Sequence, residues 1–221
     1  MGDLLTVHLV RHGQSEYNAK GRVQGHTNSP LTPQGHAQAQ ATGRALQGRE
    51  IDAIYTSDLL RAHQTAQEIG QILGIEPQPV EGLREVSLGE WEGKEIEEIR
   101  NNDPHTLELW YSSPMEARIP GAEPLDRFRE RVLETFKGLL NAHPSGEIVV
   151  VSHGGVLSVI IAEILQMSLN SLWRFRLDNA SISRLLFGLL VPKVTLLNST
   201  AHLDGLLEGA VSLWSSGRVM R

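Results

Sequence analysis

The chain has 221 residues, of which 40% are hydrophobic and 21% are charged, as in a folded globular protein and unlike a disordered or fibrous one. Its 20 Lys and Arg against 26 Asp and Glu give a net charge of -6 without a block of basic residues, which argues against nucleic acid or a membrane surface as a partner. The absence of cysteine excludes disulfides, thiolate nucleophiles and sulfur-ligated zinc.

The length fits a single domain over residues 1–221. The longest uncharged stretch, Ile148 to Ala162, is too short to cross a bilayer, and the N-terminus has no basic-then-apolar signal peptide. We therefore expect a cytoplasmic protein.

In the first half of the chain, short apolar runs alternate with helical patterns. They predict a strand at 6–10, a helix after Thr32-Pro33 and a strand at 52–56. A second helix is expected to follow, with Ser57-Asp58 as its cap and Gly74 at its end. Residues 83–93 look like a loop, and a short helix is expected over 94–100. Residues 101–121 contain three prolines and no clear periodicity, so we expect 94–121 to form a lid or cap segment.

The second half has a long apolar stripe at the 3.6-residue period, which predicts an amphipathic helix from Leu125 to Leu140. The run 148–152 is typical of a central parallel strand, and a helix through Leu165 follows it. Two further strand-like runs lie at 181–187 and 193–197, and no element is assigned to the tail at 199–221. This order predicts an α/β fold, a three-layer sandwich with a mostly parallel sheet between helices.

Basic side chains follow the carboxyl ends of three predicted strands. Arg11 and His12 follow the first, Arg61 follows the second after a short cap, and His153 follows the central one. Ligands of open α/β sheets bind beyond these ends, so the four side chains should converge there. Two guanidiniums and two imidazoles suit a phosphate dianion, and the helix N-termini that follow can add N–H donors.

Taken singly, each of these residues has an ordinary structural explanation. A histidine at a strand end is more often packed or solvated than catalytic, and a helix-face arginine such as Arg61 needs no ligand. Their common position beyond strand ends favours a shared site. The strongest candidates for a role among the other histidines are His26 and His202. All seven are interpreted as structural or surface residues: His8, His26, His36, His63, His105, His143 and His202.

Residues 9–18, with the sequence LVRHGQSEYN, resemble the signature of the histidine phosphatase superfamily, which has the phosphoglycerate mutase-like fold. Five further segments are similar to motifs of this family and occur in its order: 21–25 (GRVQG), 30–35 (PLTPQG), 55–62 (YTSDLLRA), 83–93 (LREVSLGEWEG) and 151–155 (VSHGG). The resemblance extends over residues 4–165 and leaves the C-terminal quarter weakly covered.

The resemblance implies a nucleophilic His12, with Arg11, Arg61 and His153 around the phosphate and Glu85 as proton donor. It further implies substrate contacts from Asn18, Gln24 and Gly154. The chemistry agrees, because neutral imidazole can attack phosphorus and a protonated carboxyl can protonate the leaving oxygen. Spacing alone leaves three other carboxyls open for the acid role: Glu81, Glu90 and Glu92.

A zinc site built from His12, His153 and a glutamate is the alternative mechanism. Arg11 argues against it, because a fixed guanidinium next to a ligand repels a dication. We therefore predict no metal and no cofactor. Only 67 residues separate Glu85 from His153, whereas mutases of the superfamily carry a longer insertion there.

Two segments near the C-terminus, 178–181 and 197–203, are similar to a subset of the branch that includes metal-independent phosphoserine phosphatases and sugar-acid phosphate phosphatases. The predicted function is hydrolysis of small phosphomonoesters through phospho-His12. The alternatives are a phosphoglycerate mutase, a sugar-bisphosphatase or a non-catalytic module that binds phosphorylated ligands. A small phosphorylated metabolite is the expected partner, and a homodimer is left open.

Overall fold

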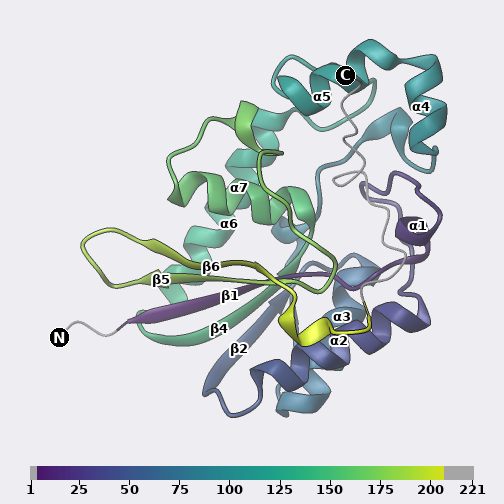
Figure 1. The fold of residues 1–221 in the computed structure, drawn as a ribbon. Helices are drawn as coiled ribbons and strands as arrows, with labels where there is room; N and C mark the ends of the chain where they lie inside the picture. The colour runs from purple at the N-terminus through teal and green to yellow at the C-terminus, as the bar shows by residue number, and fades with distance from the viewer. Residues whose placement is uncertain (1–3, 207–221) are drawn as a thin grey trace.

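The computed structural model describes residues 4–206, and a six-stranded sheet lies at their centre. Its strands are β1 (Leu5–Arg11), β2 (Ile51–Thr56), β3 (Gln78–Pro79), β4 (Gly146–Ser152), β5 (Ile182–Phe187) and β6 (Lys193–Ser199). In the order β3-β2-β4-β1-β5-β6, the first four strands are parallel, whereas β5 and β6 form an antiparallel hairpin at one edge (Figure 1). The predicted mostly parallel sheet is confirmed.

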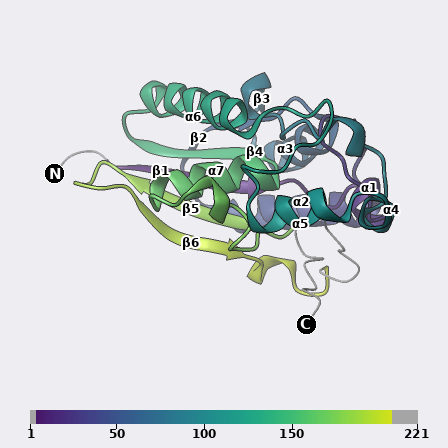
Figure 2. The same cartoon turned by 90° about the horizontal axis from the view of Figure 1, so that it is seen from above.

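Helices form a layer on each face of the sheet (Figures 1 and 2). One layer contains α2 (Pro33–Leu46) and α3 (Leu60–Leu73), and the other contains α6 (Leu125–Ala142) and α7 (Gly154–Ile164). Successive residues of β4 therefore pack into different cores. Ile148 and Val150 belong to the core that contains α6 and α7, whereas Val149 and Val151 belong to the core that contains α2 and α3. Because the middle of β4 is buried on both faces, its residues there have to be apolar. With helices on both faces of the sheet, the predicted three-layer sandwich is confirmed.

Several helix boundaries follow from local chemistry. Thr32 caps α2 by accepting the N–H of Gly35, and α3 ends at Gly74, whose φ of 73° is left-handed. The predicted cap at Ser57-Asp58 is wrong, because Leu59 is the N-cap residue of α3 and makes no side-chain bond.

The predicted lid segment contains two helices, α4 (Ile96–Asn102) and α5 (Pro104–Ser112). The sequence predicted the first of them and missed the second, as it missed the four-residue α1 (Glu16–Ala19). Both helices of the segment contribute buried side chains to the core shared with α6 and α7: Ile96, Ile99, Leu107 and Trp110. The segment is therefore anchored to the sandwich, and its role as a lid remains a prediction.

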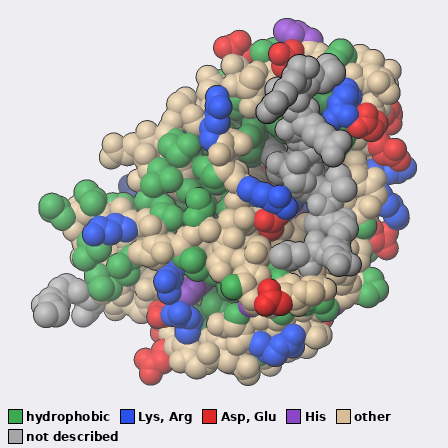
Figure 3. Space-filling view, in the orientation of Figure 1, with side chains coloured by type: hydrophobic (Ala, Val, Ile, Leu, Met, Phe, Trp, Pro, Cys, Tyr) green, Lys and Arg blue, Asp and Glu red, His purple; other side chains and the backbone are tan. Residues whose placement is uncertain are grey.

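On the face seen in Figure 3, hydrophobic side chains gather around the β5–β6 hairpin, whereas charged side chains are scattered over the rest. Leu190 and Val191, between the two strands, are among the exposed large hydrophobic residues. No helix within residues 4–206 is long and apolar enough to span a membrane.

Candidate active site

The first two site residues are fixed where β1 ends beside β4. Arg11 is the last residue of β1 and lies opposite Ser152 in the parallel register. The backbone N–H of His12 continues the pairing by donating to the carbonyl of Ser152 over 2.9 Å. His153 follows Ser152 directly after the end of β4, and the centroids of the two imidazoles lie 5.2 Å apart. Register pairing thus places the two histidines together.

The proton of His12 is located by its hydrogen bond. Its Nδ1 lies 2.7 Å from the carbonyl oxygen of Gly13, which can only accept, so Nδ1 carries the hydrogen and Nε2 keeps its lone pair. Burial, followed by the charges of Arg61 and Arg11, lowers the pKa of His12 well below its ordinary value. The imidazole is therefore neutral at neutral pH, the form a nucleophile needs.

The loop after His12 is held by a residue that sequence reasoning did not assign to the site. Asn179 donates from Nδ2 to the carbonyl of His12 over 2.9 Å and to Oδ1 of Asn18 over 3.2 Å. Asn179 lies in segment 178–181, and the similarity of that segment to a subset of phosphatases was the one feature of the sequence that could have pointed to this residue.

Two guanidiniums, those of Arg11 and Arg61, share the pocket with the imidazole. Arg11 donates to the carbonyl of Leu177, and Arg61, in the first turn of α3, donates to the carbonyls of Gly25 and Thr27. Burial lowers the pKa of each arginine to about 10, so both remain charged at neutral pH. The Nε atom of each is buried without a hydrogen-bond partner. Buried cationic donors left unpaired by the protein suit an anionic ligand.

Glu85 lies against the N-terminus of α7. One carboxyl oxygen accepts the N–H of Val86 and the other accepts the N–H of Gly155, each over 3.0 Å. Burial raises the pKa of Glu85, although these two hydrogen bonds and the charges of Arg61 and Arg11 act in the opposite direction. A raised pKa favours the protonated carboxyl that a proton donor requires.

The competing carboxyls have other surroundings. The side chain of Glu81 is 76% exposed and pairs with Arg84. Glu92 accepts hydrogen bonds from the backbone of His26 and Leu88, and although its partial burial acts to raise its pKa, these and further hydrogen bonds lower it. Neither side chain lines the pocket that contains His12. Glu85 is among the residues that line this pocket.

His153 lies deeper than the other site residues. It is the N-cap residue of α7, it is fully buried, and its Nε2 is 2.8 Å from Oγ of Ser57. Its Nδ1 is buried without a hydrogen-bond partner. Burial, followed by the charge of Arg61, lowers its pKa well below the ordinary value, so the imidazole is neutral.

One pocket brings most of the predicted site residues together: Arg11, His12, Asn18, Gln24, Arg61 and Glu85 line it. His153 and Gly154 are not among its lining residues, although the His153 ring lies beside that of His12. Four further residues line the pocket and were not singled out from the sequence: Arg22, Val23, Gly25 and Leu88. The first three lie in the 21–25 motif.

Among the described residues, no group of three or more His, Asp or Glu side chains is arranged to hold a metal ion. The pocket instead combines fixed positive charge, a neutral imidazole and a buried carboxyl. The first two suit an electron-rich phosphoryl group and the third suits its leaving oxygen. The fold and the pocket thus fit an α/β enzyme that transfers phosphoryl groups.

Comparison with known proteins gives the family. Residues 7–200 match the model of the histidine phosphatase superfamily (branch 1), and the chain belongs to that superfamily. A relative from Hydrogenobacter thermophilus, named "Putative phosphoserine phosphatase 2", is 36% identical over 179 residues, which cover 81% of this chain and 88% of the relative. A relative from Salmonella choleraesuis, named "Probable phosphoglycerate mutase GpmB", is 33% identical over 182 residues, which cover 82% of this chain and 85% of the relative.

A solved structure, Bacillus stearothermophilus YhfR, is similar with a TM-score of 0.85 and 30% identity, covering 90% of this chain and 99% of that one. The phosphoglycerate mutase-like sandwich predicted from the sequence is thus confirmed. Because the chain belongs to the histidine phosphatase superfamily and its relatives include proteins named as phosphatases, it is a phosphoric monoester hydrolase.

Proposed function

We propose that the protein hydrolyses small phosphomonoesters without a metal ion, through a phosphoryl group carried on Nε2 of His12. The observation that carries this proposal is the hydrogen bond between Nδ1 of His12 and the Gly13 carbonyl. It leaves Nε2 unprotonated in a pocket that also contains two buried guanidiniums. A nucleophile and a phosphate site therefore coincide.

In the first step, Nε2 of His12 forms a bond to phosphorus while the bond from phosphorus to the ester oxygen breaks. Arg11 and Arg61 stabilise the negative charge that spreads over the phosphoryl oxygens. Nδ1 of His153, which is buried without a hydrogen-bond partner beside the ring of His12, adds a hydrogen-bonding group. Glu85 gives its proton to the departing alkoxide and becomes a carboxylate.

In the second step, the Glu85 carboxylate takes a proton from water as the water oxygen attacks the phosphorus of phospho-His12. The bond from nitrogen to phosphorus breaks and inorganic phosphate leaves. Glu85 is again protonated and His12 is again neutral, so the cycle needs no further reactant. The substrate contacts proposed for Asn18 and Gln24 follow from their position in the pocket lining.

The mutase named among the relatives keeps a second possibility open, in which the phosphoryl group passes to a substrate hydroxyl instead of water. The two activities differ in their product, since only hydrolysis releases inorganic phosphate. A sugar-bisphosphatase would appear as a preference among substrates. A cytoplasmic location and a homodimer stay predictions from the sequence.

The test is phosphate release across a panel of phosphomonoesters that includes phosphoserine, 3-phosphoglycerate, sugar phosphates and p-nitrophenyl phosphate. Mass spectrometry of enzyme quenched in alkali after brief mixing should find a phosphoryl group on His12. His12→Ala should abolish both signals, whereas His36→Ala, on the surface of α2, should leave them unchanged. A phosphoryl group on Ser15, Ser57 or Ser152 would show that the nucleophile is wrong. Binding without turnover would favour the non-catalytic module.

A further inference from the structure

The segment that carries Glu85 is irregular, and side chains from other elements hold its backbone. The carbonyls of Gly82, Arg84 and Glu85 accept hydrogen bonds from the single guanidinium of Arg131, over 2.9, 2.9 and 3.4 Å. The carbonyl of Leu83 accepts from Oγ of Ser152 over 2.8 Å. Four successive carbonyls are therefore paired with side chains, which satisfies backbone acceptors that no strand or α-helix pairs here.

The carbonyl of Glu85 has a second donor. Nε2 of His26 lies 2.7 Å from it, so this nitrogen carries the hydrogen of that ring. His26 is one of the two histidines that the sequence left as candidates for more than a structural or surface role, and in the structure it donates a hydrogen bond to the backbone carbonyl of Glu85.

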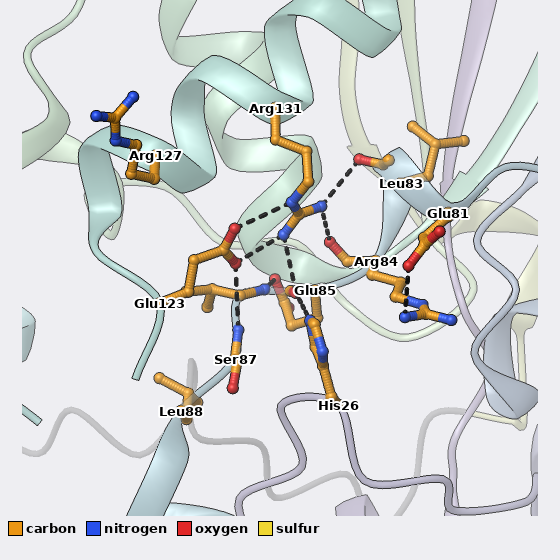
Figure 4. A network of polar contacts seen from close by, with 12 residues as sticks. His26, Glu81, Leu83, Arg84, Glu85, Ser87, Leu88, Glu123, Arg127 and Arg131 are labelled. Carbon is orange, nitrogen blue, oxygen red and sulfur yellow. Dashed lines mark hydrogen bonds and ion pairs between the residues drawn. The ribbon is translucent and has the colours of Figure 1, made fainter. Parts of the chain in front are cut away.

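Arg131 lies on α6 and is itself held in place by Glu123. Its Nε donates to one carboxyl oxygen over 3.0 Å and its Nη2 to the other over 2.7 Å, which is the bidentate arrangement. Figure 4 shows the guanidinium between Glu123 on one side and the backbone around Arg84 and Glu85 on the other. The five N–H bonds of an arginine side chain are thereby all engaged. The side chains of Arg131 and Glu123 are only 26% and 19% exposed, so solvent competes weakly.

Close packing joins the same helix to the segment. A Cβ atom on Gly82 would lie 2.0 Å from Oγ1 of Thr135, which sits one turn after Arg131. The backbone at 82 can therefore approach α6 only because it carries no side chain. Arg127, one turn before Arg131, points away from the segment and pairs with Glu130 at the surface (Figure 4).

We propose that Arg131, oriented by Glu123, is the positioning residue for Glu85, fixing where the carboxyl meets the leaving oxygen of the substrate. This inference rests on the proposed function, in which Glu85 is the proton donor. Arg131 does not line the pocket, so it acts through the backbone and not on the phosphate. Its loss should impair proton transfer while leaving phosphate binding intact.

Arg131→Lys is the test variant. An ammonium keeps the charge but is a single point with three donors, so it cannot hold Glu123 and three carbonyls together. The rate of phosphoenzyme formation is measured with the best alkyl phosphate of the panel and with p-nitrophenyl phosphate, whose leaving group needs little protonation. Inhibition by vanadate reports the phosphate site. Arg127→Lys, on the same helix, is the matched control.

We expect Arg131→Lys to slow phosphorylation by the alkyl ester on the order of 10- to 100-fold, as small misplacements of catalytic groups do. Phosphorylation by p-nitrophenyl phosphate should stay within about threefold of wild type, because its leaving group needs little protonation. Vanadate inhibition should stay in the same range, because Arg131 does not line the pocket. Arg127→Lys should match wild type throughout. If Arg131→Lys does not fold, Glu123→Gln, which weakens the orientation of Arg131, should give the same selective pattern with a smaller loss.

The proposal is overturned if both esters slow equally, if vanadate inhibition weakens in parallel, or if Arg131→Lys behaves as wild type. Each of these results can be separated from failure of the proposed function. That function fails if the wild-type protein forms no phospho-His12, whatever the variants do.

Discussion

Gly155→Ala tests the placement of Glu85 from the side of its carboxyl. Gly155 is the second residue of α7, and its N–H donates to one Glu85 oxygen. A Cβ atom added there would lie 2.3 Å from the other oxygen, whereas ordinary van der Waals contact begins at 3.4 Å. The Glu85 carboxyl must therefore move by about 1 Å, and a misplacement of about 1 Å can cost a factor on the order of 100 in rate.

The loss should depend on the leaving group. An alkyl phosphate expels a basic alkoxide that needs the proton of Glu85, so its phosphorylation step should slow by about 100-fold. Phosphorylation by p-nitrophenyl phosphate should change much less, since its phenolate leaves without a proton. Rapid-quench measurement of phosphoenzyme with both esters gives the two rates directly.

Gly138→Ala is the matched control, because Gly138 lies on α6 and its added Cβ would contact nothing within 4 Å. It should leave both rates unchanged and stabilise the protein by roughly 0.5–1 kcal/mol, the usual gain for alanine over glycine in a helix. If Gly155→Ala slows both esters equally, the strain has moved His153 or the backbone of α7 instead of Glu85. If it slows neither, the carboxyl is not confined as we describe.

Three further predictions concern charge and protonation. Extensive chelation should leave activity unchanged, and restoration of lost activity by a divalent ion would refute the metal-free mechanism. Arg61→Ala should lower kcat by about 10²–10³, as loss of one preorganised charge-stabilising donor does, and an effect on KM alone would contradict this role. Glu85→Gln should slow alkyl phosphate hydrolysis by roughly 10²–10⁴ and remove the alkaline limb of the pH profile, because activity that depends on a protonated carboxyl is lost as pH rises through its raised pKa. An alkaline limb that persists in Glu85→Gln would assign it to another group.

The candidate site residues could be located from the sequence because strand ends are easy to recognise. Apolar runs ending at Arg11 and Ser152 predicted two parallel strands, and the carboxyl ends of neighbouring parallel strands meet. Once β1 and β4 are neighbours, His12 and His153 must be close. Their placement needed only element type and order, the features that periodicity reports best.

Helix α5 was missed for a physical reason. Only Leu107 and Trp110 are fully buried among its nine residues, so the apolar repeat is too short to stand out. Its start depends on Asp103, whose side chain accepts the N–H of Thr106, and on Pro104 in the first turn. Such a capping signal was present but had no stripe behind it to support a helix.

The proposed positioning role of Arg131 could not be predicted from the sequence, for a different reason. In the sequence, Arg131 is one of three arginines on an amphipathic helix, and the pattern does not distinguish it from Arg127. Its partners are carbonyl groups 46 to 49 residues away, and a carbonyl has no identity in the sequence. Side chains that bind backbone over long separations become visible only when the fold is known.

One environment sets the protonation of both groups that the proposed mechanism uses. Burial is the largest influence on His12 and on Glu85, and it disfavours whichever form is charged. It therefore lowers the pKa of the imidazole and raises that of the carboxyl, so the proposed nucleophile is unprotonated and the proposed acid is more readily protonated at the same pH. Arg11 and Arg61 lower both pKa values, which helps the nucleophile and opposes the acid. In the proposed mechanism a bound phosphate dianion offsets those charges, so Glu85 gains its proton most readily when a substrate is in place to receive it.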